Sequence, residues 1–395
     1  MLNFTFDFTK RNAADDIIDE LIEKVLAAYP PERLERIRAR VTAAWKNDNY
    51  ADKFGDRIAY CPVDPNVELS LDVPTNLEES QADMIAQLQF MLHQSTIDSE
   101  YYPAFRSWCD QSTIPSMFEC VNEYSSDKTS VHVKPVIDKP SDVYLLPTAE
   151  FRKGFPCYDI LEQMAWRHQR CGGRIWSYMT DVQGPFSAAA QMWWVQGFMA
   201  DLYTYPEEVH HLQRLCTDAI IWFFREMYDV VEQKLVPLHA LPFTWIPNDV
   251  GVAVSDDFLS LVGVDTIREF NIPYLEQVGE AFGGVTVHSC GRINHAVEVL
   301  NEMKTLKGLN FSTSETDLRL YAQKHNPKAG LFVHKSGLSM NGLPLLTAEE
   351  HIRLCRDVFL ETGICVISNP MPMIDEGFAG VTEEMRAKWL EAAGL

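Results

Sequence analysis

The stretch Val285-Thr-Val-His-Ser-Cys-Gly291 is an apolar run that ends in two side chains able to bind metal and a turn glycine. A short run rich in β-branched residues is typical of a strand, and the glycine marks its end. Residues i and i+2 of a strand point to the same face, so the imidazole of His288 and the thiol of Cys290 should converge. The stretch predicts a buried strand with a polar group at its carboxyl end.

Short apolar runs alternate with helical patterns on both sides of this stretch. The predicted strands cover residues 174–180, 243–246, 285–288, 308–312, 330–334 and 363–368. Such alternation implies parallel strands joined by crossover helices, and right-handed crossovers in this number close most naturally into a barrel. We therefore expect an α/β fold, a (β/α)8 TIM barrel, whose active site lies at the carboxyl ends of the strands.

The first 130 residues have a different pattern, which is helical at first and then irregular. Helical spacing of apolar residues predicts helices over 13–28, 31–45 and 77–94. No internal repeat and no low-complexity linker separates this part from the rest. We expect residues 1–395 to form a single barrel domain, in which residues 1–130 include an N-terminal, mostly helical extension.

Composition narrows the classes of partner. The chain has 395 residues, 46% of them hydrophobic, and a formal net charge of −22. Such a charge repels phosphate backbones and anionic lipid surfaces, so neither nucleic acid nor a membrane is an expected partner. The N-terminus lacks the pattern of a secretory signal, and nine cysteines in a long chain are typical of reduced thiols. We expect a cytoplasmic protein.

A thiolate beside an imidazole suits zinc, which in catalytic sites usually has three protein ligands and one open position. Cys365 lies in the last predicted strand, and its thiol could reach across the mouth of a barrel to His288 and Cys290. These three residues are the expected zinc ligands. The residues alone leave open that Cys365 is a core cysteine and His288 a rim histidine.

The stretch 245–299 resembles the uroporphyrinogen decarboxylase superfamily. The resemblance rests on three segments, Asn248-Asp-Val-Gly, Ile267-Arg-Glu-Phe-Asn-Ile-Pro-Tyr-Leu and His288-Ser-Cys-Gly. Gln183-Gly-Pro-Phe and Tyr205-Pro-Glu-Glu-Val extend it over roughly 170–390. Within the superfamily the pattern is similar to the corrinoid-dependent methyltransferases of the methylcobamide:coenzyme M type, whose zinc motif is His-x-Cys followed by a distant Cys.

This resemblance implies a zinc-dependent methyltransferase. The methyl donor would be a methylcorrinoid carried by a partner corrinoid protein, and the acceptor a small thiol or a related compound. Decarboxylation of a tetrapyrrole is one alternative, although the Arg-rich N-terminal motif of true uroporphyrinogen decarboxylases is missing before residue 100. A non-catalytic barrel that binds a corrinoid or zinc is another.

Further residues at predicted strand ends are candidates for the site. Asp249 could orient a ligand or take a proton, and His334 could donate to substrate. A helix cap or a solvated acid is the alternative for Asp249, and a rim histidine the alternative for His334. Gln183 and Gly184 would shape a cofactor-binding loop, although a simple turn between a strand and a helix explains them equally well. Glu315 is the acid nearest to the place where related enzymes put a fourth zinc ligand, but it could instead be a first-turn helix acid.

Overall fold

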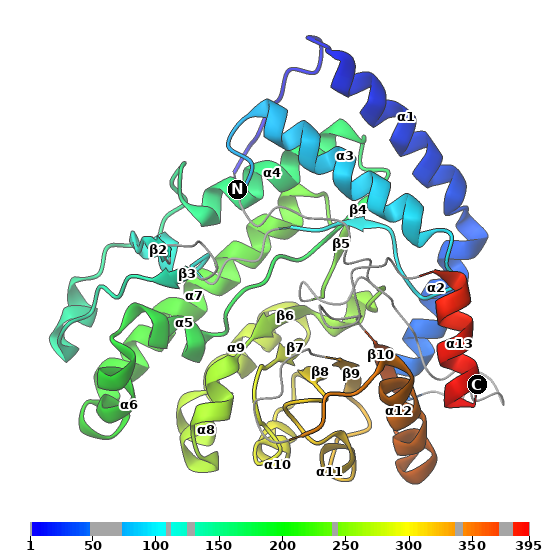
Figure 1. The fold of residues 1–395 in the computed structure, drawn as a ribbon. Coiled ribbons are helices and arrows are strands. Elements are labelled where there is room, and N and C mark those ends of the chain that lie inside the picture. The colour runs from blue at the N-terminus through cyan, green and yellow to red at the C-terminus, as the bar shows by residue number, and fades with distance from the viewer. Residues whose placement is uncertain are drawn as a thin grey trace.

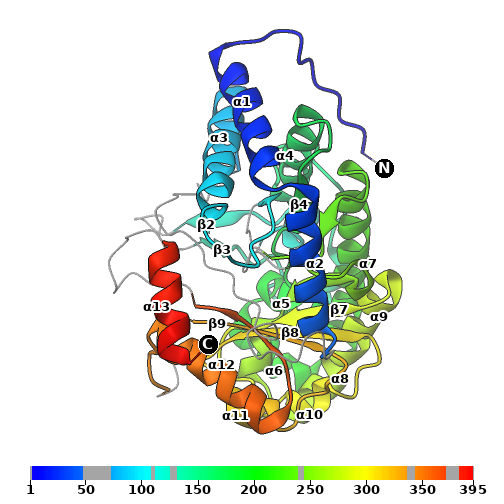
Figure 2. The ribbon, with the colours of Figure 1, turned by 90° about the vertical axis from the view of Figure 1, so that its right-hand side faces the viewer.

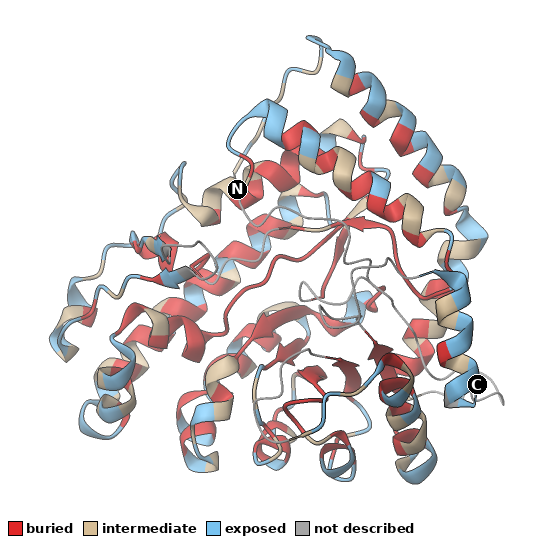
Figure 3. Ribbon diagram, in the orientation of Figure 1, coloured by how far each residue is buried: buried red, intermediate tan, exposed pale blue. Residues whose placement is uncertain are grey.

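The computed structural model describes residues 2–47, 73–107, 112–124, 131–238, 244–335, 343–370 and 382–394. In these ranges helices pack around two groups of short parallel strands (Figure 1). The strands of these two groups are mostly buried, whereas most of the surrounding helices bury one face and expose the other (Figure 3). This is the burial pattern of an α/β protein whose strands have side chains covered on both faces.

The larger sheet has five parallel strands and carries the candidate site. Their order across the sheet is β10 (Val366–Asn369), β9 (Gly330–His334), β8 (Leu306–Ser312), β7 (Val285–His288) and β6 (Val252–Ser255). Parallel neighbours need a crossover connection, which is why each strand is separated from the next by helical segments. The expected parallel strands at 285–288, 308–312, 330–334 and 363–368 are therefore confirmed, with small shifts of their ends.

The second sheet has three parallel strands, β1 (Ala104–Phe105), β4 (Trp176–Tyr178) and β5 (Leu235–Val236), in the order β1-β4-β5. A separate antiparallel pair joins β2 (Asn122–Tyr124) to β3 (Val131–Val133). The strand expected at 243–246 is wrong for its described residues 244–246, which form only one isolated bridge. Phe243 lies outside the described residues.

A parallel bridge between Gln183 and Ser255 connects the chain that follows β4 to β6. Within the described ranges, strand pairing otherwise stops at β1 and β5 in one sheet and at β6 and β10 in the other. The α/β class with parallel strands is thus established, whereas closure into an eight-stranded barrel stays a prediction.

The helices after residue 150 follow the strands in sequence and lie around them. They are α4 (Pro156–Arg170), α5 (Pro185–Met192), α6 (Val195–Thr204), α7 (Pro206–Val230), α8 (Val264–Phe270), α9 (Ile272–Phe282), α10 (Val297–Leu300), α11 (Leu318–Ala322), α12 (Ala348–Thr362) and α13 (Glu383–Ala393). In the described part of the chain, none of the helices has the length and apolar character of a membrane span.

The predicted N-terminal helices are confirmed as α1 (Ala13–Ala28), α2 (Pro31–Trp45) and α3 (Leu77–Gln94). Asn12 caps α1. Its side-chain oxygen accepts hydrogen bonds from the backbone N–H groups of Ala14 and Asp15, and the Asp15 carboxylate accepts one from the backbone N–H of Asn12. α1 packs on α3, so the apolar stripe of α1 is buried between helices.

The end of α2 covers the inner side of the five-stranded sheet, where it contacts β9 and β10 (Figure 2). Trp45, the last residue of α2, is buried against Gly308 and Gly330 of adjacent strands. A Cβ atom at Gly308 would lie 2.2 Å from the Trp45 ring, and one at Gly330 would lie 2.3 Å from it. The two glycines therefore make the space that the indole fills.

Gly308→Ala should lower the free energy of unfolding by about 1–3 kcal/mol, because the added methyl group overlaps a rigid ring. Urea denaturation of the purified variant measures this. Adding Trp45→Leu should recover part of the loss. Gly263→Ala is the control, since no atom lies within 4 Å of a Cβ built at Gly263. Equal losses in the two glycine variants would contradict the packing argument.

Candidate metal centre

His288 is the last residue of β7, and its ring orientation is set by the next strand. The imidazole is buried, and Nδ1 lies at hydrogen-bond distance from Oδ1 of Asn310 on β8, its register partner. The Asn310 amide nitrogen donates to the carbonyl of Phe332 at 3.2 Å, so the amide oxygen is the atom that faces the ring. Nδ1 therefore carries the proton, and the lone pair of Nε2 points away from Asn310.

Nε2 of His288 faces the thiol of Cys290, at 3.4 Å from Sγ. After β7 the chain turns at Gly291, whose φ of +84° is a conformation that favours glycine. This turn leaves Cys290 exposed as a residue, with its thiol directed back to the histidine. The convergence of the two side chains predicted from the sequence is thus what the structure shows.

Asp257 completes a group of three potential ligands. Its Oδ1 accepts the backbone N–H of Cys290 at 2.7 Å and lies 3.9 Å from Nε2 of His288. One ligand atom each from Asp257, His288 and Cys290 lie within 4.8 Å of one another. In the described ranges this is the one group of three or more His, Cys, Asp or Glu side chains close enough to hold a metal ion.

Asp257 was not among the residues singled out from the sequence. It begins a short 3-10 helix (Asp257–Leu261) that follows β6. The parallel pairing of Ser255 with His288 brings this turn beside the end of β7. A signal was available, since Val252-Ala-Val-Ser is a short apolar run followed at once by Asp256 and Asp257. Acids directly after such a run lie at the carboxyl end of a strand, where barrel active sites form.

Asp256 is a buried support beneath this group. Its side chain accepts hydrogen bonds from Ser187 at 2.6 Å and from Asn271, and its backbone N–H donates to the carbonyl of His288 at 2.7 Å. Burial raises the pKa of Asp256 to about 7. These bonds connect α5, β6, β7 and α9 at one point. Asp256 therefore fixes the position of its neighbour Asp257 relative to His288.

Negative charge surrounds the thiol of Cys290. Oε2 of Glu315 accepts the amide of Gly291 at 2.9 Å, and Asp181, which accepts a hydrogen bond from Ser255, lies on another side. Burial of the thiol, followed by the charges of Asp257 and Glu315, raises the pKa of Cys290 well above its ordinary value. Burial and the charge of Asp257 also raise the pKa of Glu315. An isolated thiolate is unfavourable here, whereas a bound cation would stabilise it.

Several of the expected site residues lie near this centre. His334, the last residue of β9, stacks on His288 with ring centroids 5.9 Å apart. Glu315 contacts the turn after Cys290, as described above. Gln183 and Gly184 pair with Ser255, and a Cβ at Gly184 would lie 3.0 Å from the Asp256 carboxylate. Gln183 and Gly184 thus lie beside Asp256, at the carboxyl end of β6.

The structure does not bring Cys365 to the other two expected zinc ligands. Cys365 precedes β10, and its pairing level is that of Gly330 and Gly308, at the amino ends of the strands. It is buried in the apolar cluster that contains Trp45. The prediction placed its thiol in the carboxyl half of the strand, but β10 begins only at Val366, so Cys365 is at the opposite end from the centre.

Asp249 is also placed away from the centre. It lies in a 3-10 turn (Asn248–Val250) before β6, with its side chain 66% exposed. The carboxylate binds the ammonium of Lys46 at 2.8 Å, and this partner lowers the pKa of Asp249. The amino end of the strand is the wrong side for contact with His288. Its surroundings are those of a solvated acid that ties β6 to the end of α2.

The donor set fits zinc. One imidazole nitrogen, one thiolate sulfur and one carboxylate oxygen are ligands that catalytic zinc sites use, and three protein ligands leave a fourth position open. Asn310 holds the histidine in the tautomer whose free nitrogen faces the group, as partners of ligand histidines do in metal sites. We therefore assign Asp257, His288 and Cys290 as the residues that could hold the metal, with Glu315 next to them.

Comparison with known protein families gave no match, and comparison with curated protein sequences gave none. Among solved structures, the chain is similar to a methyltransferase from Methanosarcina mazei, with a TM-score of 0.59 and 17% sequence identity. The similarity covers 90% of this chain and 97% of that chain. At this identity the likeness shows that the two proteins share a fold.

Alkylation of Cys290 tests the electrostatics of the metal-free protein. Because the pKa of the thiol is raised, the thiolate is the minor form, and the rate with iodoacetamide should rise about tenfold per pH unit between pH 7 and 9. Glu315→Gln removes a neighbouring negative charge, lowers the pKa of Cys290 and should increase the rate at pH 8. Mass spectrometry of the peptide that contains Cys290 measures the modification.

Glu298→Gln is the control for this experiment, since Glu298 is exposed and pairs with Lys324. The alkylation rate of Cys290 in this variant should equal the rate in the protein without a substitution. An alkylation rate of Cys290 that no longer rises above pH 7 would show that the thiolate is already the major form there. This result would contradict the raised pKa of Cys290.

Proposed function

We propose that the protein is a zinc-dependent methyltransferase that moves a methyl group from a methylcorrinoid, carried by a partner protein, to a thiol. The observation that carries the proposal is the group formed by Asp257, His288 and Cys290 at the carboxyl ends of parallel strands. The shared fold with a methyltransferase supports the same reaction class.

Zinc bound at this group would act as a Lewis acid that lowers the pKa of a substrate thiol. The protein provides a neutral nitrogen ligand from His288, whose tautomer is fixed, and two anionic ligands from Asp257 and Cys290. The two negative charges would balance the charge of the zinc ion. Such a site is a mild Lewis acid suited to a soft sulfur ligand. The proposal replaces Cys365, which the sequence suggested, with Asp257.

The proton of the incoming thiol needs an acceptor close to the metal group. Glu315 is buried beside Gly291, and its raised pKa brings it nearer to the range of a general base. The sulfur then forms a bond to the methyl carbon, the carbon–cobalt bond breaks, and its electron pair stays on cobalt. His334, stacked on His288, lines the side of the site toward β9 and β10.

The charge of the site argues against the alternative of tetrapyrrole decarboxylation. The acids Asp181, Asp257 and Glu315 all raise the pKa of Cys290, so each of them contributes negative charge there. A substrate with several carboxylates would be repelled at this place. The non-catalytic alternative is a barrel that only binds a corrinoid or zinc. Thiol-dependent demethylation of methylcobalamin distinguishes it from an enzyme.

The purified protein should contain close to one equivalent of zinc, and His288→Ala, Cys290→Ala and Asp257→Asn should each lose most of it. Cys365→Ala is the matched control, because it removes a buried thiol of the same chain from the apolar cluster around Trp45. It should lower the thermal stability slightly and retain the zinc. Elemental analysis together with circular dichroism distinguishes loss of metal from loss of fold.

Loss of zinc from Cys365→Ala, with retention in Asp257→Asn, would contradict the ligand set. A position of Cys365 in the first coordination sphere would then follow, as the sequence suggested. Full zinc content in the Cys290→Ala variant would contradict a metal site at this group altogether.

Methylcobalamin with an excess of thiol should be demethylated slowly by the zinc-loaded protein, with the loss of the methylcobalamin absorbance as the readout. Removal of zinc by a chelator should reduce the rate at least tenfold, and Glu315→Gln should reduce it and move its pH dependence to higher pH, because the thiol proton loses its acceptor. Protein that binds zinc but gives no thiol-dependent rate above the background would support the binding-protein alternative.

A further inference from the structure

Asn369, the last residue of β10, is a polar side chain buried in the interior. It is 0% exposed, and neither its amide nitrogen nor its amide oxygen has a hydrogen-bond partner among the described residues. A buried amide without partners costs stability, and native proteins retain few of them. A group with a free donor and a free acceptor at a strand end is what a ligand-binding residue requires.

The side chain of Asn369 points to the same face as the candidate centre. Along β10, Val366 belongs to the cluster beneath the outer helices, whereas Ile367 belongs to the inner cluster that contains Trp45. Because the faces alternate, Asn369 points inward with Ile367. It is paired in register with His334, whose ring stacks on that of His288. In the order of the strands, Asn369 on β10 and His288 on β7 thus lie on opposite sides of β9.

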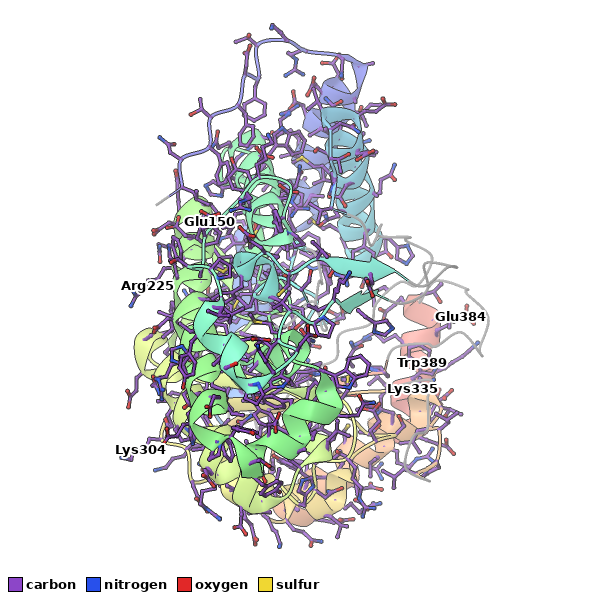
Figure 4. The ribbon with its side chains drawn as sticks, turned by 90° about the vertical axis from the view of Figure 1, so that its left-hand side faces the viewer. Glu150, Arg225, Lys304, Lys335, Glu384 and Trp389 are labelled. Carbon is purple, nitrogen blue, oxygen red and sulfur yellow. The ribbon has the colours of Figure 1, made fainter. Side chains whose placement is uncertain are left out.

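The charges around this interior are arranged unequally. Zinc would offset the charges of Asp257 and Cys290. The carboxylates that remain are those of Glu315, which accepts the amide of Gly291, and Asp181, which accepts a hydrogen bond from Ser255 at the end of β6. Among the described residues, Arg292 is exposed, and the surface residues Arg225 and Lys304 project outward at the edge of the molecule (Figure 4).

Lys335 follows His334 and is buried, so its direction matters for the charge of the interior. Strand alternation places it on the outer face, and burial together with the charge of Lys335 lowers the pKa of His351 on α12. Its charge is therefore directed to the outer helices and not to the place between Asn369 and Cys290.

We propose that Asn369 binds the polar end of the methyl acceptor, and that this end is neutral or cationic and not anionic. This inference rests on the proposed function. The sulfur of the acceptor would lie at the group of Asp257, His288 and Cys290, and its chain would pass His334 to reach the Asn369 amide. Adjacent strands are about 4.8 Å apart, so the polar end is separated from the sulfur by a chain of several bonds.

Binding of three matched probes tests the inference without turnover. The probes share an S-methylated butyl chain and end in a carboxamide, an ammonium or a carboxylate group. Calorimetry with the zinc-loaded protein should give the tightest binding for the carboxamide or the ammonium probe and the weakest for the carboxylate. An S-methylated ethyl chain that ends in an ammonium group should bind more weakly than its butyl counterpart, because it is too short to span the site.

Asn369→Leu has nearly the same volume but no hydrogen-bonding atoms. It should weaken binding of the carboxamide probe about tenfold while the melting temperature is unchanged or higher, since an unpartnered amide is removed from the interior. Asn369→Asp should favour the ammonium probe and weaken the carboxylate probe further. Ser368→Ala is the control: Ser368 is the neighbouring buried residue of β10, strand alternation directs it to the outer face, and its change should leave probe binding unchanged.

Equal probe affinities for Asn369→Leu and the unmodified sequence would overturn the inference, as would tightest binding of the carboxylate probe or no binding of any probe. A lower melting temperature of Asn369→Leu with unchanged probe binding would show a structural role. Zinc content and methylcobalamin demethylation are measured on the same samples. Normal values there, together with a failed probe experiment, reject the acceptor assignment and leave the proposed function intact.

Discussion

The parallel register between β6, β7 and β8 is the constraint on which the centre depends. It aligns Ser255 with His288 and His288 with Asn310, so the carboxyl ends of β6 and β7 lie at the level of Asn310 on β8. Residues that follow these ends, above all Asp257, then lie within reach of the imidazole. A shift of one residue would turn His288 away from this face, because strand side chains alternate. The Asn310 amide adds a chemical constraint, since it determines which nitrogen of His288 is free.

The amino and carboxyl ends of the strands differ in the kind of side chain that is buried there. At the amino ends, the indole of Trp45 fills the space left by Gly308 and Gly330, and Cys365 packs in the same cluster. At the carboxyl ends, polar side chains are buried and acids gather around one thiol. Apolar packing at one end provides rigidity, and the unsatisfied polar groups at the other end are retained at a cost to stability. This division explains why the cysteine that precedes β10 lies in apolar packing, while the cysteine that follows β7 lies among polar and acidic groups.

The collected acids also define what the site can accept. Asp257 and Glu315 are each held by a backbone amide of the turn after β7, so their positions are fixed before any ligand arrives. Fixed negative charge favours a cation as a resident ligand and disfavours anionic substrates. The buried amide of Asn369 is a further polar group at the same ends of the strands.

The sequence by itself determined the three N-terminal helices, most of the parallel strands of the larger sheet and the convergence of His288 with Cys290, but it missed β6. The correct predictions follow from local rules, namely the spacing of apolar residues and the alternation of a strand. The tertiary structure decided the third member of the group, because the distance between Asp257 and His288 depends on the register of two strands. It also decided the place of Cys365 and Asp249. An error of a few residues in the predicted start of a strand is enough to move a residue from one end of the strand to the other. Spacing along the chain placed Cys365 within the last strand, whereas the structure has it just before that strand, at the amino end and away from His288.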